Sequence, residues 1–239
     1  MLHYALFDLD DTLYPSGTGL WDAIGERIHL YMIERLGLNP ADVPALRHRY
    51  FDAFGTTLNG LRHNFGIDPE DYLAFVHDLP LEQYLQPDPA LNAMLARLPL
   101  TKVIFTNADA AHARRVMERL GVARHFKHII DIHALAFVNK PEPGAYTRAL
   151  ELLSAQPAEC LFVEDSRRNL LPARVLGMLT VLVGGAGGPS ALDGVDYWIP
   201  DVLGLPSSLA SPSAARRAGP SSSCNLCIHE STPLSFRPG

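Results

Sequence analysis

The chain has few of the features that mark secreted or membrane-spanning proteins. Only three of its 239 residues are cysteine (Cys160, Cys224 and Cys227), too few for a disulfide framework and in agreement with a reducing compartment. No apolar run is long enough to span a bilayer, and acidic residues within the first dozen positions are not typical of a signal peptide. We therefore expect a cytoplasmic protein that does not act on a membrane.

A basic excess is also absent. The formal net charge is −6 at pH 7, which argues against a nucleic-acid partner. An acidic protein that binds phosphates usually needs a metal ion or local hydrogen-bond donors to do so. Hydrophobic residues make up 47% of the chain, enough for a packed core, so disorder of the whole chain is not expected.

Composition and pattern divide the chain into three parts. Residues 206–239 contain nine Ser and five Pro without periodicity, which predicts a disordered tail. Cys224, Cys227 and His229 of that tail give three plausible ligands where a structural zinc site needs four, so we assign them no site. We expect residues 1–14 and 87–205 to form a core domain and residues 15–86 to form a helical insertion.

Short apolar runs alternate with helical patterns in the core segments. Strands are expected at residues 3–7, 102–106, 160–163 and 179–183, with a weaker candidate at 128–131. Helices are expected from residue 88 onward and over 109–120, 143–154 and 168–176. This alternation predicts an α/β fold in which a mostly parallel sheet lies between two layers of helices.

The insertion, residues 15–86, has helical spacing throughout. Trp21, Ile24, Ile28, Tyr31 and Met32 share one helical face, and we expect them to pack in the core. Because the insertion follows the first strand directly, it is well placed to cover the carboxyl end of that strand.

Polar side chains gather where the predicted strands end. The segments are Asp8-Leu9-Asp10-Asp11-Thr12, Thr106-Asn107 and Glu164-Asp165-Ser166, with Lys140 preceding the strand at 160–163. Ligands of open parallel sheets bind at the carboxyl ends of the strands. Clustered acids repel one another unless a cation is present, and oxygen ligands favour Mg²⁺. We therefore predict a magnesium site at this edge.

Roles follow from the spacing of these residues. If the first strand continued, Asp8 and Asp10 would share a face, so that one carboxylate attacks phosphorus while the other handles the proton. Thr106 and Lys140 would hold and neutralise the phosphoryl group, and Asp165, with Glu164 as a further candidate, would complete the metal shell. Taken singly, Thr106 is equally typical of a helix cap and Lys140 is more typical of a surface lysine; the order of all the motifs favours a site.

Four segments, FDLDDTLY, FTNA, NKPEPGAY and VEDSRRN, resemble the motifs of the haloacid dehalogenase-like hydrolase superfamily, over residues 3–184. The resemblance implies a Rossmann-like three-layer core, Asp8 as nucleophile and Asp10 as acid/base. It also implies Mg²⁺ held by Asp8, the backbone carbonyl of Asp10 and Asp165. Members that perform dehalogenation lack the second acid, so we expect a phosphatase.

The segments FGTTLNGLRHNFGIDPEDY, LQPDP and FTNADAAHARRVMERLG are similar to the pyrimidine 5′-nucleotidase subgroup, whose helical cap occupies the position of residues 15–86 and whose assigned substrates include UMP and CMP. This similarity implies a nucleoside monophosphate as substrate. The expected substrate-binding residues are Asn107, Thr56, Thr57 and His63, within a wider set that adds Phe54, Gly55, Asn59, Gly60, Arg62 and Asn64.

Several alternatives remain open on the sequence. They are a phosphatase for sugar phosphates or other small phosphorylated metabolites, and a phosphate-binding module without turnover. A receiver domain is disfavoured, because its phosphoacceptor would follow a middle strand and it has no place for the insertion. We expect a monomer or a homodimer.

Overall fold

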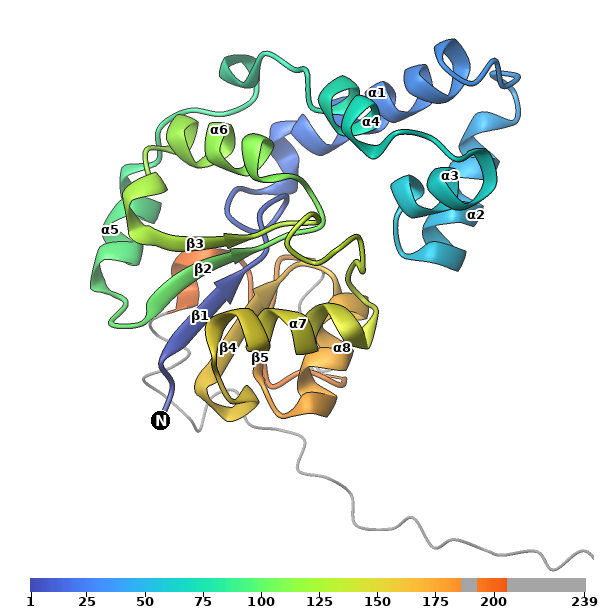
Figure 1. The fold of residues 1–239 in the computed structure, drawn as a ribbon. Coiled ribbons are helices and arrows are strands. Elements are labelled where there is room, and N and C mark those ends of the chain that lie inside the picture. Colours follow the sequence, from blue (N-terminus) through green and yellow to red (C-terminus); the bar gives the residue numbers. More distant parts are fainter. Residues whose placement is uncertain (186–192, 206–239) are drawn as a thin grey trace, which may run out of the picture.

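The computed structural model describes residues 1–185 and 193–205. Within them a six-stranded sheet runs in the order β3-β2-β1-β4-β5-β6, and every neighbouring pair is parallel (Figure 1). The strands are β1 (Tyr4–Phe7), β2 (Thr101–Phe105), β3 (Phe126–Ile130), β4 (Cys160–Glu164), β5 (Leu179–Val183) and β6 (Tyr197–Ile199). The predicted α/β fold with a parallel sheet is therefore confirmed.

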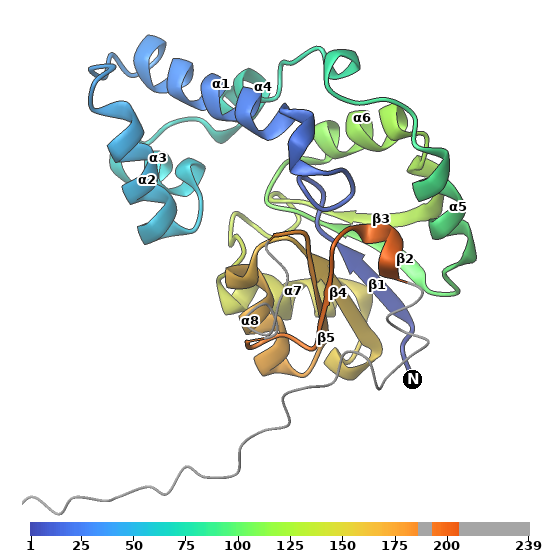
Figure 2. The same cartoon turned by 180° about the vertical axis from the view of Figure 1, so that it is seen from behind.

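Helices cover both faces of this sheet (Figure 2). One face carries α5 (Pro89–Arg97), α6 (Ala110–Leu120) and η6 (Val202–Gly204), and the other carries α7 (Pro143–Leu153) and α8 (Arg167–Leu176). Alternate residues of β1 divide between the two cores: Ala5 and Phe7 pack on the first side and Leu6 on the second. Two short turns, η3 (Ala123–His125) and η4 (Pro157–Glu159), lead into β3 and β4.

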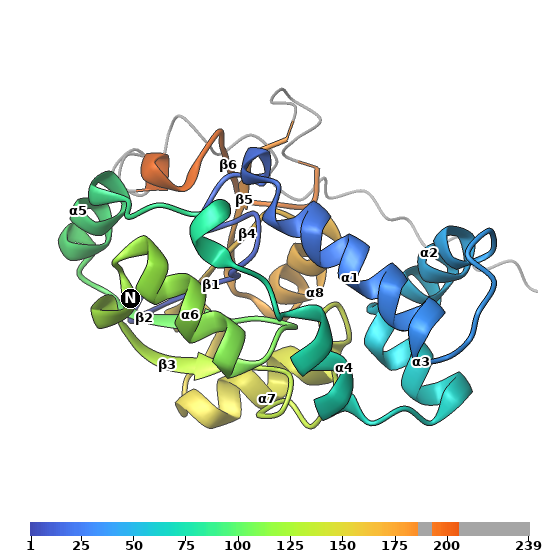
Figure 3. The same cartoon turned by 90° about the horizontal axis from the view of Figure 1, so that it is seen from above.

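Between β1 and α5 the chain forms the helical insertion. Its elements are η1 (Ser16–Thr18), α1 (Leu20–Glu34), α2 (Val43–Phe54), α3 (Thr57–Phe65), α4 (Pro69–Val76) and η2 (Leu81–Gln83). Seen from above, α1 extends away from the sheet and carries α2 and α3 at its far end (Figure 3). Tyr31 of α1 packs edge-on against Tyr72 of α4, with ring centroids 5.0 Å apart. The insertion thus stands beyond the carboxyl ends of the strands (Figure 1).

Two expectations need correction. Trp21 does not pack in the core with Ile24, Ile28 and Met32: it lines a pocket and is 42% exposed, whereas its neighbour Leu20 is buried at the start of α1. Strand β6 was not expected, since three residues at a sheet edge carry no readable periodicity.

The predicted tail, residues 206–239, lies outside the described residues. No described helix has the length and apolarity needed to cross a membrane.

Candidate active site

A pocket of about 640 Å³ lies between the strand ends and the helical insertion. The strand β1 ends at Phe7, and a turn follows, yet the acids after it still face this pocket. The predicted site residues that line it are Asp8, Asp10, Thr56, Thr57, Thr106, Asn107, Lys140, Glu164 and Asp165. His63 is not among the lining residues, because it sits on the exposed side of α3, where its ring lies 5.1 Å from that of Phe54.

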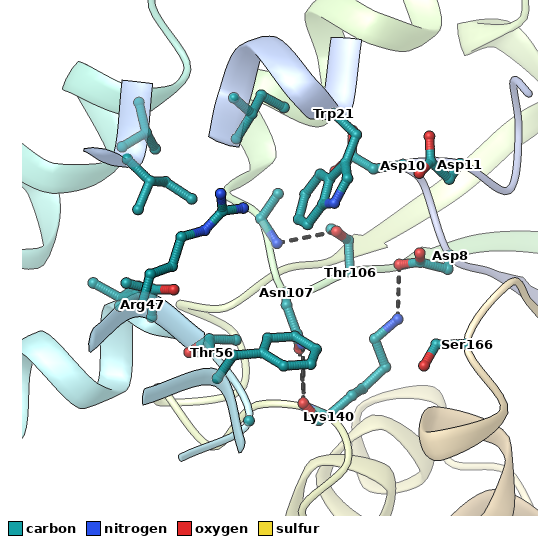
Figure 4. Close-up of a pocket in the computed structure, with 18 of the residues that line it drawn as sticks. Asp8, Asp10, Asp11, Trp21, Arg47, Thr56, Thr106, Asn107, Lys140 and Ser166 are labelled. Atoms are coloured by element: carbon teal, nitrogen blue, oxygen red, sulfur yellow. Dashed lines mark hydrogen bonds and ion pairs between the residues drawn. The ribbon is translucent and has the colours of Figure 1, made fainter. Parts of the chain in front are cut away.

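Lys140 is the centre of the polar cluster. Its Nζ donates to Asp8 Oδ1 and Glu164 Oε2, each at 2.7 Å, and to the Phe105 carbonyl at 2.9 Å. The side chain is 1% exposed, so its interpretation as a surface lysine is wrong. Burial alone would lower the pKa of Lys140, but the two facing carboxylates outweigh burial and raise it. Lys140 therefore presents a fixed positive charge beside Asp8 (Figure 4).

The positive charge of Lys140 does not fully offset the burial and mutual repulsion of the carboxylates in this cluster. Burial, together with the charge of Glu164, raises the pKa of Asp8 to about 7 against the opposing effect of Lys140. Burial likewise raises the pKa of Glu164 to about 7. Oxygen atoms of Asp8, Glu164 and Asp165 lie within 4.8 Å of one another, and Asp11 has a buried Oδ1 with no partner among the described residues. A hard divalent cation with oxygen ligands fits this arrangement.

Within the cluster, Glu164 differs from the other two acids. Its Oε2 accepts from Lys140 and its Oε1 accepts from the Ser166 backbone N–H at 3.1 Å, so both oxygens are engaged. Asp165 is exposed and makes two hydrogen bonds with Thr12. The Thr12 hydroxyl donates to Asp165 Oδ1 at 3.3 Å and accepts from the Asp165 backbone N–H at 3.1 Å. The geometry favours Asp8 and Asp165 as direct ligands, with Glu164 positioning Lys140.

Asp10 is anchored by two residues that sequence reasoning missed. The Tyr14 hydroxyl donates to Asp10 Oδ1 at 2.6 Å, and His112 Nε2 lies 3.1 Å from the same oxygen. Burial opposes ionisation of Asp10, but His112 and Tyr14 outweigh it and leave the pKa of Asp10 lowered. His112 in turn stacks on His77, with ring centroids 4.1 Å apart, and His77 Nδ1 lies 2.5 Å from Asp109.

The turn after β2 shapes the floor of the pocket. Thr106 Oγ1 accepts from the Ala108 backbone N–H at 3.0 Å, whereas the cap of α6 is Asp109, so Thr106 is not the helix cap. The side-chain amide of Asn107 bonds the backbone of Lys140 twice: its Oδ1 accepts from the Lys140 N–H at 2.8 Å, and its Nδ2 donates to the Lys140 carbonyl at 3.0 Å. Asn107 therefore fixes the Lys140 loop and keeps one amide N–H for other partners.

Thr56 and Thr57 begin α3 at the edge of the pocket. The Thr56 hydroxyl accepts from the Asn59 backbone N–H at 3.2 Å and donates to Asn139 Oδ1 at 3.4 Å, so it serves as a helix cap. Thr57 is buried and lines the pocket. The junction between α2 and α3 thus rests on the loop that carries Lys140.

The insertion also supplies lining residues that sequence analysis did not single out as a site. They are Trp21, Ile24, Ile28, His29, Pro44, Arg47, His48, Phe51, Leu58, Tyr72, Leu73, Val76 and His77. Arg47 and Trp21 lie across the pocket from Asp8 (Figure 4). No periodic signal in the sequence separates these positions from the buried face of the same helices.

Comparisons with known proteins agree with this geometry. The sequence family described as haloacid dehalogenase-like hydrolase matches residues 3–177. "Phosphate metabolism protein 8" of Saccharomyces cerevisiae is 30% identical over 72% of this chain and 58% of its own length. "Phosphoglycolate phosphatase" of Neisseria gonorrhoeae is 29% identical over 73% of this chain and 77% of its own. In fold, the chain is similar to L-2-haloacid dehalogenase from Xanthobacter autotrophicus, at a TM-score of 0.58 and 18% identity over 88% and 99% of the two chains.

Proposed function

Because the chain belongs to the haloacid dehalogenase-like hydrolases, we propose that it is a phosphatase that hydrolyses small phosphomonoesters with Asp8 as nucleophile. The observation that carries this proposal is the pairing of Asp8 with the buried Lys140 in a pocket that also contains Asp10. A second acid is needed to protonate an alkoxide leaving group, and Asp10, which lines the same pocket as Asp8, supports this role.

The residues divide the reaction into two steps. Asp8 attacks phosphorus, the ester P–O bond breaks, and an aspartyl-phosphate forms while Asp10 gives a proton to the leaving oxygen. Asp10 then takes a proton from water as that water attacks phosphorus and frees Asp8. The lowered pKa of Asp10 suits this second, basic role.

Charge that develops on the phosphoryl oxygens meets fixed donors. Lys140 stabilises it from beside Asp8, and the turn at Thr106 offers a hydroxyl and backbone N–H groups. Mg²⁺, held by Asp8, Asp165 and the backbone carbonyl of Asp10, would neutralise phosphoryl charge when bound. Residues 15–86 act in this proposal as a cap that covers the reacting group.

Two substrate classes are candidates. Resemblance of the cap to pyrimidine 5′-nucleotidases supports nucleoside 5′-monophosphates, and the exposed rings of Trp21 and Phe51 offer surfaces on which a base can stack. The name of the Neisseria relative supports small phosphorylated acids instead. Both classes use the same catalytic residues.

Phosphate release from a substrate panel with Mg²⁺ and with EDTA tests the proposal. The panel comprises UMP, CMP, AMP, GMP, sugar phosphates, phosphoglycolate and an aryl phosphate. We expect magnesium-dependent release that Asp8→Asn lowers by at least about 10⁴-fold, with an unchanged circular dichroism spectrum. Retained activity in Asp8→Asn would refute the nucleophile assignment. Absence of release from every substrate would favour a phosphate-binding module.

A further inference from the structure

Arg47 of α2 lines the pocket from the cap side, across from Asp8 (Figure 4). Within residues 1–185 and 193–205, no carboxylate oxygen lies within 4.0 Å of its guanidinium. Lys140, the other lysine or arginine in the lining, is neutralised by Asp8 and Glu164. Arg47 is thus a permanent positive charge in the pocket that lacks a counter-ion from the described chain.

The structure holds this guanidinium in place. Its Nη1 lies 3.4 Å from His29 Nε2. Burial, and then the charge of Arg47, lower the pKa of His29, which keeps the imidazole neutral and able to accept that hydrogen bond. A Cβ at Gly25 would lie only 2.8 Å from Nη1, so the glycine on α1 leaves room for the guanidinium. One of the five guanidinium N–H donors is engaged in this way, and the planar fork keeps the rest for a ligand.

Apolar side chains form the wall beside Arg47. Ile24, Ile28 and Tyr72 line the same pocket and are buried. Burial raises the pKa of Tyr72, and the charge of Arg47 acts in the opposite direction. The positive charge therefore lies close to that buried ring. A charge beside apolar groups is poorly solvated, so an anion that reaches it gains a stronger interaction than it would in open water.

We propose that Arg47 binds a second anionic group of the substrate, a carboxylate or a second phosphate, at the end remote from the phosphate that Asp8 attacks. A guanidinium fork matches either oxyanion with two parallel hydrogen bonds. The inference rests on the proposed phosphatase function, and of the two substrate classes it selects the phosphorylated acids.

Matched substrates test this selection. Phosphoglycolate and ethyl phosphate differ mainly in a terminal carboxylate against a methyl group, and UMP provides a large neutral leaving group. We expect wild-type kcat/KM to favour phosphoglycolate over ethyl phosphate. Arg47→Met should lower kcat/KM for phosphoglycolate by about 10- to 150-fold, as for the loss of a hydrogen bond to a charged group, and for ethyl phosphate by no more than about 3-fold.

Arg49→Met is the matched control, because Arg49 lies two residues further along α2, is exposed and does not line the pocket. It should leave both values unchanged. An equal loss for both substrates in Arg47→Met, or a loss confined to UMP, would overturn the inference while leaving the phosphatase function intact. If wild type hydrolyses none of the three esters, calorimetric titration with phosphoglycolate and Mg²⁺ compares Asp8→Asn with the double variant that adds Arg47→Met. An equal affinity of the two proteins for phosphoglycolate would also overturn the inference.

Discussion

Single residues in this site act through the contacts that fix them. Asp8 and Lys140 are 132 positions apart, and the sequence predicted that both reach the same edge of the sheet, but the ion pair between them is seen only in the structure. Tyr14 and His112 could not be assigned in the same way. Each has an ordinary packing role in the sequence pattern, and only the fold shows that both reach one oxygen of Asp10.

Tyr14→Phe tests the anchoring of Asp10. The variant removes one hydroxyl donor from Asp10 Oδ1, so the lowered pKa of Asp10 should rise. We expect kcat to fall about 10-fold with KM within about 3-fold, because a hydrogen bond to a charged group is lost. The acidic limb of the kcat profile should move to higher pH, since Asp10 must be ionised to accept a proton from water. Steady-state kinetics from pH 4.5 to 8 measure both effects.

His112→Asn should act in the same direction as Tyr14→Phe, because it weakens the second contact to the same oxygen. His128→Asn is its control, since His128 is exposed on β3 and lies outside the pocket lining. If the acidic limb stays fixed in both Tyr14→Phe and His112→Asn, the two residues serve packing alone.

At the scale of elements, the sequence predicted the strands β1 to β5 and the helices α5 to α8 to within about two residues, because these segments have clear periodicity and end at Gly121 and Gly177 or begin with Pro. It did not show how the insertion is joined to the core. One hydrophobic cluster runs through both parts, and polar side chains add to the contact: Asn59 Nδ2 donates to the Phe137 carbonyl at 2.8 Å, and Arg168 bonds the carbonyls that end α2. Polar pairings of this kind leave no periodic trace.

Gly55→Ala tests the junction of α2 and α3. Gly55 has φ of +78°, and a Cβ there would lie 2.2 Å from Asn139 Nδ2. We expect a loss of about 2–4 kcal/mol in the free energy of unfolding, from backbone strain plus displacement of Asn139. Since Asn139 precedes Lys140, kcat/KM should fall about 10-fold or more. Urea denaturation and kinetics measure the two effects.

Gly66→Ala supplies the comparison for this junction. Gly66 has φ of +64° at the end of α3, but a Cβ there meets nothing within 4 Å. The variant should lose only about 1–2 kcal/mol, from backbone strain, with activity unchanged. If the two variants behave alike, contact with the Lys140 loop is not what Gly55 provides.

For the whole molecule, the decisive feature is an acidic pocket within an acidic chain. Its net charge of −6 gives no general attraction for phosphates, so binding must depend on the few cations that face the pocket. The sequence placed the acids at the strand ends, but it could not give the degree of burial that makes them costly to ionise. Burial depends on how the segments around the strand ends pack together, which is a property of the folded chain.

Stability should therefore depend on magnesium and pH together. Folding raises the pKa of Asp8 and Glu164 to about 7, so these groups stabilise the fold below their ordinary pKa, and that contribution is lost as the pH rises through about 7. Without metal, we expect the contribution of Asp8 and Glu164 to the free energy of unfolding to decline from pH 5 to pH 8. Mg²⁺ would compete with protons for the carboxylate of Asp8, so its stabilising effect should grow over that interval.

At pH 8 and about 100 times its Kd, Mg²⁺ should add about 2.7 kcal/mol and raise Tm by roughly 5–10 °C, with a smaller rise at pH 5. Scanning calorimetry with Mg²⁺ and with EDTA measures the difference. Asp165→Asn removes an exposed carboxylate from the cluster and should reduce the rise at pH 8, whereas Asp42→Asn, at an exposed residue outside the pocket lining, should not. An equal rise at both pH values would mean that the metal binds without displacing a proton from Asp8, and Asp8 would then not be a ligand of the metal.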